Sequence, residues 1–337
     1  MTQIERLQKS GIKRLGSPRR GFRYQTADGA KVSRAALARI DALRIPPAWT
    51  GVAINAAANG AVQVIGQDAA GRWQYLYHDK QVRRREQKKF QRLLAFARAL
   101  PQMRKVVARD LRKSDLGRER VMAGVLRILA TCFIRPGSQV YASENGSFGL
   151  ATLRPSHVRV RGDLVQFNFP GKSGVRQERE LRDRQVARVV RALLRVPAKE
   201  VFKYQNGEGA FVDVKRRHIN EYIKEVMGAN FSAKDFRTWA GTIVCACALA
   251  RCGDELPDTA AGRKRKIVAA IKETAAVLGN TPAVCRSAYI SPAVLDNFER
   301  GKVIACRFET VEALVNHRGK HMHDAERALL RLLRNRN

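Results

Sequence analysis

The segment FSAKDFRTWAGT, residues 231–242, opens the part of the chain around which the rest is organised. Ser232 is a favourable helix N-cap and Asp235 follows three residues later, which predicts that a helix begins here. Arg237 then lies within the first turns of that helix. The positive end of a helix adds to the charge of a guanidinium when a phosphate lies beside it, so this segment predicts an anion site.

The segment LGNTPAVCRSAYIS, residues 278–291, follows one predicted helix later. Gly279 is typical of a helix C-terminus, and Thr281–Pro282 is typical of the start of the next helix. That next helix carries Tyr289 near its end. Asn280 lies between the two helices, so the segment offers an amide and a phenol nine residues apart.

Two further cations lie upstream in defined settings. Arg135 lies in the motif FIRPGS and Lys172 in the motif PGKSG. Alternating apolar and polar residues predict three short strands around Lys172, at residues 157–160, 164–169 and 175–181. Lys172 is therefore expected at the tip of a β-hairpin.

Together these side chains suit metal-free cleavage of a phosphodiester. A phenol can attack phosphorus, guanidinium and amide groups can hold the charged phosphoryl oxygens, and an ammonium can give a proton to the departing alcohol. No carboxylate pair or DxD motif suited to two-metal chemistry is present, so no metal site and no cofactor are predicted. The candidate catalytic residues are Arg135, Lys172, Arg237, Asn280 and Tyr289.

The composition points to nucleic acid as the partner. The net charge is +34, from 64 Lys+Arg against 30 Asp+Glu, an excess that a polyanion would neutralise. The basic residues are spread along the chain rather than gathered beside one amphipathic helix, which disfavours a membrane partner. None of the six cysteines lies in a CxxC pair, and the charged N-terminal residues do not form a signal peptide. We therefore expect a cytoplasmic protein.

Residues 1–85 are predicted to form a small mixed α/β domain that binds DNA. We expect the polar and basic residues 1–30 to form a partly ordered arm that touches phosphates. Helical and then strand-like patterns follow, ending in RWQYLYH. The polar, basic context of these strands suggests groove contacts by Gln67, Arg72, Gln74 and Tyr75. Aromatic residues at strand spacing are more often core residues than base-stacking residues, so that alternative stays open for Tyr75.

Residues 86–337 are predicted to form a larger, mainly α-helical catalytic domain that contains the three short strands. Helices are expected at about 102–114 and 117–132, and the chain from about 183 onward is expected to be almost entirely helical. The last 35 or so residues are basic and amphipathic, which suggests a docked helix or a tail that faces DNA. The fold class is therefore α+β.

Six segments in order resemble the type IB DNA topoisomerases, in particular the bacterial members of the poxvirus-like group. The resemblance covers roughly residues 20 to 295. It implies a C-shaped clamp around duplex DNA, a monomer that works without a cofactor, and a nucleoid-associated location. The segments are IPPAWT, GQDAAGRWQYLYH, IRPGSQVYASENGSFGLATLR, GKSG, AKDFRTWAGT and LGNTPAVCRSAYISP.

The resemblance also implies roles for individual residues. Tyr289 would form a 3′-phosphotyrosyl link while Lys172 protonates the 5′ oxygen, and relaxation would need neither ATP nor metal. Many viral and eukaryotic members have histidine where this chain has Asn280, and an amide can donate a hydrogen bond but cannot become cationic. Lys234 matches these topoisomerases and is expected to contact DNA, whereas the related tyrosine recombinases usually have histidine there.

Two alternative functions remain open at this point. A site-specific tyrosine recombinase would use the same chemistry but would need two DNA sites and a protein assembly. A non-enzymatic basic DNA-binding protein would account for the charge alone.

Overall fold

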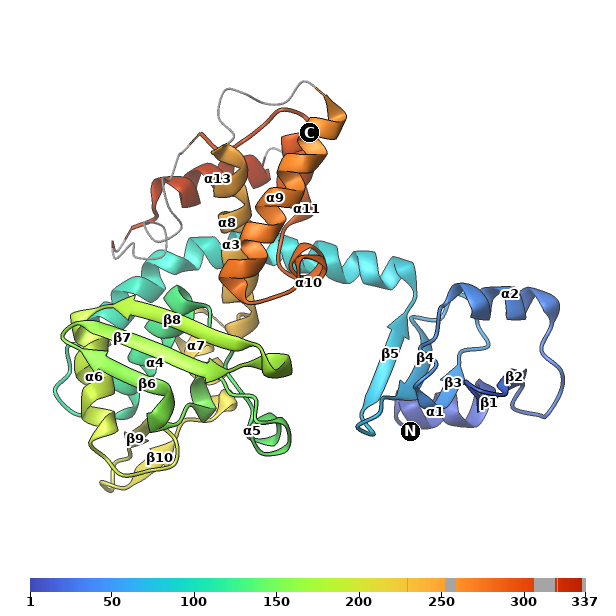
Figure 1. The fold of residues 1–337 in the computed structure, drawn as a ribbon, viewed down its shortest axis with the longest axis horizontal. Helices are drawn as coiled ribbons and strands as arrows, with labels where there is room; N and C mark the ends of the chain where they lie inside the picture. The colour runs from blue at the N-terminus through green and yellow to red at the C-terminus, as the bar shows by residue number, and fades with distance from the viewer. Residues whose placement is uncertain (229, 252–258, 306–318, 320, 335–337) are drawn as a thin grey trace. The chain divides into compact units, whose positions relative to one another are not determined.

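The computed structural model describes residues 1–228, 230–251, 259–305, 319 and 321–334. The chain divides into two compact units, Met1–Phe90 and Gln91–Asn337, with the division near the predicted boundary at residue 85. Helices and small antiparallel sheets build both units, which agrees with the predicted α+β class (Figure 1). Among the described residues, no helix is both long and apolar enough to cross a bilayer.

The N-terminal unit is built on one antiparallel sheet with the strand order β2-β1-β3-β4-β5. Side chains alternate between the two faces of a strand, so Val52 and Ile54 of β3 share a core with Ile40 of α2, whereas Ala53 packs with Leu7 of α1. The two helices thus cover opposite faces of the sheet. The elements are α1 (Gln3–Ser10), β1 (Ile12–Ser17), β2 (Gly21–Gln25), α2 (Arg34–Ala42), β3 (Thr50–Ile54), β4 (Val62–Gln67) and β5 (Trp73–Tyr77).

The prediction of a partly ordered arm over residues 1–30 is wrong. A capping box between Thr2 and Glu5 begins α1, and β1 and β2 form a hairpin within the sheet. Ile12 is buried and pairs with Ile54 of β3. Leu7 and Ile12 are both buried and anchor the segment, although two apolar residues are too few to produce a hydrophobic pattern among so many basic residues.

The first helices of the second unit differ in part from the prediction. Helix α3 runs without a break from Asp79 to Asp110 and includes Pro101. The prediction of a separate helix at 102–114 is therefore wrong. Buried residues on both sides of the proline, such as Phe96 and Met103, keep the segment on one core. Helix α4 (Arg118–Cys132) is confirmed, and the short α5 (Gln139–Asn145) follows it.

The three predicted strands are confirmed as the antiparallel sheet β6 (Val158–Arg161), β7 (Leu164–Pro170) and β8 (Arg176–Arg182). The expectation of an almost entirely helical remainder is wrong at one place. There β9 (Lys203–Gln205) and β10 (Phe211–Asp213) form a second hairpin. These strands of three residues are too short to show a period of two.

The remaining helices form the core around the two segments 231–242 and 278–291. Helices α8 and α9 pack against each other (Figure 1). Phe96 of α3 meets Phe236 of α8 edge to face, with 4.9 Å between ring centres. The elements are α6 (Arg184–Leu194), α7 (Arg216–Met227), α8 (Ala233–Ala250), α9 (Ala260–Leu278), α10 (Pro282–Ala288), α11 (Pro292–Glu299) and α13 (Asp324–Arg334).

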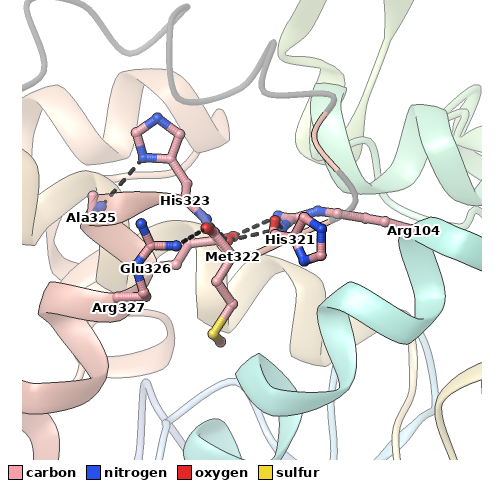
Figure 2. A network of polar contacts seen from close by, with 7 residues as sticks. All are labelled: Arg104, His321, Met322, His323, Ala325, Glu326 and Arg327. Atoms are coloured by element: carbon pink, nitrogen blue, oxygen red, sulfur yellow. Dashed lines mark hydrogen bonds and ion pairs between the residues drawn. The ribbon is translucent and has the colours of Figure 1, made fainter.

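The C-terminal region contains a docked helix, one of the two possibilities raised for the tail. Glu326 of α13 is buried and forms a bidentate ion pair with Arg104 of α3, at 2.6 and 2.9 Å (Figure 2). The same carboxylate accepts a hydrogen bond from the backbone of His323 at 2.9 Å. Residues 306–318, 320 and 335–337 of the predicted tail lie outside the described residues.

Candidate active site

Arg237 lies in the first turns of α8, as the sequence pattern predicts. The helix begins at Ser232, whose backbone N–H donates to the Asp235 carboxylate at 2.9 Å in a capping box. Arg92 of α3 holds the other carboxylate oxygen at 3.1 Å. Because Asp235 is buried, these contacts fix the start of α8 and therefore the backbone at Arg237.

The Arg237 side chain, only 3% exposed, ties together two segments that are distant in the sequence. Nη2 donates to the carbonyl of Leu278 at 2.9 Å, and Nη1 donates to the carbonyl of Phe133. Phe133 precedes Arg135 by two residues, and Leu278 precedes Asn280 by two. One guanidinium thus sets the distance between the predicted catalytic loops.

Arg135 and Asn280 are in direct contact. Nη2 of Arg135 donates to Oδ1 of Asn280. Burial, together with the nearby charge of Arg237, lowers the pKa of Arg135 from its ordinary value. Arg135 is a cation at neutral pH, because a guanidinium loses its proton only in strongly basic solution.

Two buried donors in this cluster have no acceptor among the described residues. They are Nε of Arg237 and Nδ2 of Asn280. An unsatisfied buried donor costs about 1–3 kcal/mol, so native structures rarely keep one without a reason. A tetrahedral anion with several acceptor oxygens fits such a pair.

Tyr289 ends helix α10 and is held by its backbone. Its N–H donates to the carbonyl of Cys285 at 3.0 Å, and its carbonyl lies 3.1 Å from the hydroxyl oxygen of Thr242 in α8. The same hydroxyl accepts from the backbone N–H of Ser291 at 3.2 Å. Thr242 therefore binds the chain on both sides of the tyrosine.

Gly241 lets α8 approach Tyr289 closely. A Cβ atom at Gly241 would lie 2.8 Å from both Cβ and the carbonyl oxygen of Tyr289, which is closer than real contacts allow. A glycine inside a helix costs up to about 1 kcal/mol relative to alanine. The close packing against Tyr289 supplies a reason for it.

The electrostatic environment of Tyr289 favours the phenolate. The guanidinium carbon of Arg237 lies 5.0 Å from the centre of the tyrosine ring. Burial alone would raise the pKa of Tyr289, but the charges of Arg237, Arg135 and Lys234 outweigh it and lower the pKa below its ordinary value. A lower pKa makes the phenol easier to ionise, and an ionised phenol is the stronger nucleophile.

Lys172 lies at the tip of the β7–β8 hairpin, as predicted, where Lys172–Gly174 form a short 3-10 turn. Its side chain is exposed. Among the residues that the structure describes, Lys172 forms no hydrogen bond or ion pair with the other four candidate residues. The arrangement thus brings Arg135, Arg237, Asn280 and Tyr289 together and leaves Lys172 on a separate projecting turn.

Lys234, predicted to contact DNA, is an exposed residue in the first turn of α8. Its charge contributes to the lowered pKa of Tyr289, so it lies within electrostatic range of the candidate nucleophile.

The four candidate DNA contacts of the N-terminal unit lie on β4, β5 and the turn between them. Arg72 and Gln74 both donate to the Asp68 carboxylate, at 3.0 and 2.8 Å. Tyr75 packs against the core on the α1 face and stacks on Tyr77, with 6.1 Å between ring centres. Gln67 pairs with Trp73 across the β4–β5 ladder.

Sequence reasoning did not assign roles to Thr242 or Gly241, which support Tyr289. Only the helical glycine carries a local signal, because a glycine inside a helical pattern costs about 1 kcal/mol relative to alanine. The threonine acts through a contact 47 residues along the chain, which no local pattern reveals.

Comparison with known proteins gives the class of the chain. A family model described as the catalytic core of eukaryotic DNA topoisomerase I matches residues 78–304. A second model, the N-terminal domain of bacterial DNA topoisomerase IB, matches residues 21–68. The two matches together cover most of both structural units and define a DNA topoisomerase.

Similar proteins narrow the class to one family. The chain is 31% identical over 304 residues to DNA topoisomerase 1B of Acanthamoeba polyphaga mimivirus, covering 89% of this chain and 90% of that protein. It is 25% identical over 235 residues to DNA topoisomerase 1B of Vaccinia virus (strain Western Reserve), covering 69% and 71%. The chain belongs to the type IB DNA topoisomerase family.

Proposed function

We propose that this type IB topoisomerase cleaves one strand of duplex DNA with Tyr289 as the nucleophile. The phenolic oxygen attacks a backbone phosphorus, the Tyr289 Oη–P bond forms and the bond from phosphorus to the 5′ oxygen breaks. The products are a 3′-phosphotyrosyl link and a free 5′-hydroxyl. The observation that carries this proposal is the position of Tyr289 beside Arg237, where neighbouring cations lower its pKa.

The phosphoryl oxygens would be held by Arg135, Arg237 and Asn280. Negative charge builds on these oxygens as the phenol attacks, and preorganised donors stabilise it without rearranging. The unpaired Nε of Arg237 and Nδ2 of Asn280 support this role, because an oxyanion would supply the acceptors that they lack. Arg135 adds a second cation and orients the amide.

Lys172 would act as the general acid. It gives a proton to the departing 5′ oxygen, while the proton of Tyr289 is released to solvent. Its place on a hairpin tip supports this role, since an exposed turn can reach a leaving group outside the buried cluster.

The covalent link would conserve the free energy of the broken phosphodiester, so religation by the 5′-hydroxyl needs no ATP. The guanidinium groups provide the charge stabilisation that metal ions give other phosphoryl-transfer enzymes, so the proposal includes no metal or cofactor. While the strand is open, rotation of the downstream duplex removes supercoils. We propose a monomer that binds duplex DNA, with contacts from Lys234 and from Gln67, Arg72, Gln74 and Tyr75, and a nucleoid location.

The test is plasmid relaxation by wild type and by Tyr289→Phe in excess EDTA without nucleotide. Wild type should relax the plasmid and leave a trapped protein–DNA adduct. The variant should bind DNA normally but form no adduct and relax nothing. Relaxation by the variant at near wild-type rate would remove the nucleophile assignment, and a strict need for Mg²⁺ in wild type would overturn the metal-free account.

A further inference from the structure

Gln177 of β8 is a buried polar residue that the chemistry proposed above does not use. It lies at the base of the hairpin that carries Lys172 and pairs with Phe169 of β7, just before the turn. Its side chain therefore lies inside the molecule at the point where the lysine turn meets the rest of the unit.

Two glycines enclose this side chain, and each directly precedes a candidate catalytic residue. A Cβ atom at Gly171, next to Lys172, would lie 2.7 Å from Cγ of Gln177. A Cβ atom at Gly279, next to Asn280, would lie 2.6 Å from its Oε1. A side chain at either position would displace the glutamine, so Gln177 fills the space between the two loops.

Polar contacts fix the orientation of the glutamine. Its Oε1 accepts from Nη2 of Arg179 at 3.1 Å, and its Nε2 donates to the carbonyl of Val175 at 3.3 Å. Burial lowers the pKa of Arg179, and the charge of Arg237 acts in the same direction, so this arginine lies within electrostatic range of the cationic cluster.

The two loops differ in how much they depend on Gln177. Asn280 has anchors of its own, because Arg135 bonds its side chain and Arg237 bonds the carbonyl of Leu278. The lysine turn has short internal bonds, such as Gly171 N–H to the carbonyl of Val175 at 2.9 Å. These set the shape of the turn, and the N–H of Phe148 donates to the carbonyl of Pro170 at 2.9 Å and ties the base of the turn to the segment beside Arg135. Toward the end of α9, the turn is held by Gln177.

We infer that Gln177 is a positioning residue. Its side chain lies between the Lys172 turn and the end of α9, and it holds the turn so that Lys172 points toward the leaving group. This inference rests on the proposed role of Lys172. A displacement of about 1 Å can cost about 10²-fold in rate, so loss of the side chain should slow cleavage by about 10- to 100-fold. The defect should lie in leaving-group protonation rather than in attack by Tyr289.

The experiment compares single-turnover cleavage of duplexes that differ at one atom, with either oxygen or sulfur at the 5′ bridging position of the cleaved linkage. A thiol is a much stronger acid than an alcohol, so the sulfur leaving group departs without a proton. Gln177→Ala should be slow on the oxygen substrate and close to wild type on the sulfur substrate. Gln177→Glu, which keeps the shape and the acceptor for Arg179, should be less impaired.

Reference variants distinguish an error in the positioning role of Gln177 from an error in the general-acid role of Lys172. Lys172→Ala should show the same rescue by sulfur, and Asn280→Ala should be slow on both substrates. Gln166→Ala, in the same sheet but bonded to Glu180 at its surface, should behave like wild type. If Lys172→Ala is rescued and Gln177→Ala is not, the positioning role is wrong. If Lys172→Ala is not rescued, the proposed general acid is wrong.

Discussion

The guanidinium carbon of Arg237 lies 5.0 Å from the centre of the Tyr289 ring, while its two terminal nitrogens bond the carbonyls of Phe133 and Leu278. The side chain that lowers the pKa of the candidate nucleophile therefore also holds the loops bearing Arg135 and Asn280. Electrostatics and loop geometry in this site depend on the same residue. Variants of Arg237 would disturb both at once, so variants of its neighbours give clearer tests.

The pH dependence of cleavage should report the lowered pKa of Tyr289. The phenolate is the attacking species, so the rate should rise with pH and reach its half-maximum below about 10, the ordinary tyrosine value. Arg135→Ala removes a nearby positive charge, which should move the midpoint to higher pH. The measurement is single-turnover adduct formation on a substrate with a sulfur leaving group, so that Lys172 is not required.

The midpoint, rather than the absolute rate, is the relevant quantity, since Arg135→Ala also loses contacts to the phosphate. An unchanged midpoint in Arg135→Ala would show that this arginine does not act on the ionisation of Tyr289.

Gly241→Ala should impair cleavage without abolishing DNA binding. The new Cβ would lie 2.8 Å from two atoms of Tyr289, so the tyrosine must shift. A shift of about 1 Å can cost about 10²-fold in rate. Adduct formation should fall by roughly that factor, while the affinity for duplex DNA, measured by filter binding, stays near wild type.

A matched control exists in α4. A Cβ atom at Gly124, also within a helix, would come no closer than 3.5 Å to Val189, an ordinary contact. Gly124→Ala should therefore keep full activity and gain up to about 1 kcal/mol of helix stability. Equal cleavage by the two alanine variants would mean that the close approach at Gly241 has no role in placing Tyr289.

The features that the sequence predicted well are local ones. The cap at Ser232, the helix start at Thr281 and the hairpin around Lys172 each depend on residues within a few positions, so they could be read from the chain. The prediction of a continuous helical remainder failed at β9 because strands of three residues have no measurable period.

Contacts between distant segments could not be predicted in this way. Gln177 fits between two glycines that are 108 positions apart in the chain, and nothing around it in the sequence distinguishes it from the other polar residues of β8. The bond from Arg135 to Asn280 likewise joins residues 145 positions apart. The chemistry of the candidate residues, together with the family resemblance, identifies them as a set, whereas the residues that support them become visible only in the fold.

Asn280→Asp should reduce the rate of cleavage by about 10²–10³-fold, the usual effect of losing one preorganised donor to an oxyanion. The aspartate keeps an oxygen for Arg135 but replaces the unpaired Nδ2 donor with a second acceptor. Asn280→His restores an N–H donor and should recover part of the rate. Both would be measured by single-turnover adduct formation, and near wild-type cleavage by Asn280→Asp would exclude the amide from the oxyanion site.

Glu326→Ala should destabilise the second unit. Glu326 and Arg104 have side chains that are only 4% and 14% exposed, so removing one leaves a largely buried charge without its partner. Breaking a buried pair typically costs about 3–5 kcal/mol, and the partial exposure of Arg104 places the expectation toward the lower end. Thermal unfolding should show a clear drop in Tm.

Asp324→Ala is the control variant. It removes an exposed ion pair with Arg327 on the same helix, which is worth at most about 1 kcal/mol. Similar Tm values for the two variants would show that the Arg104 pair does not anchor α13.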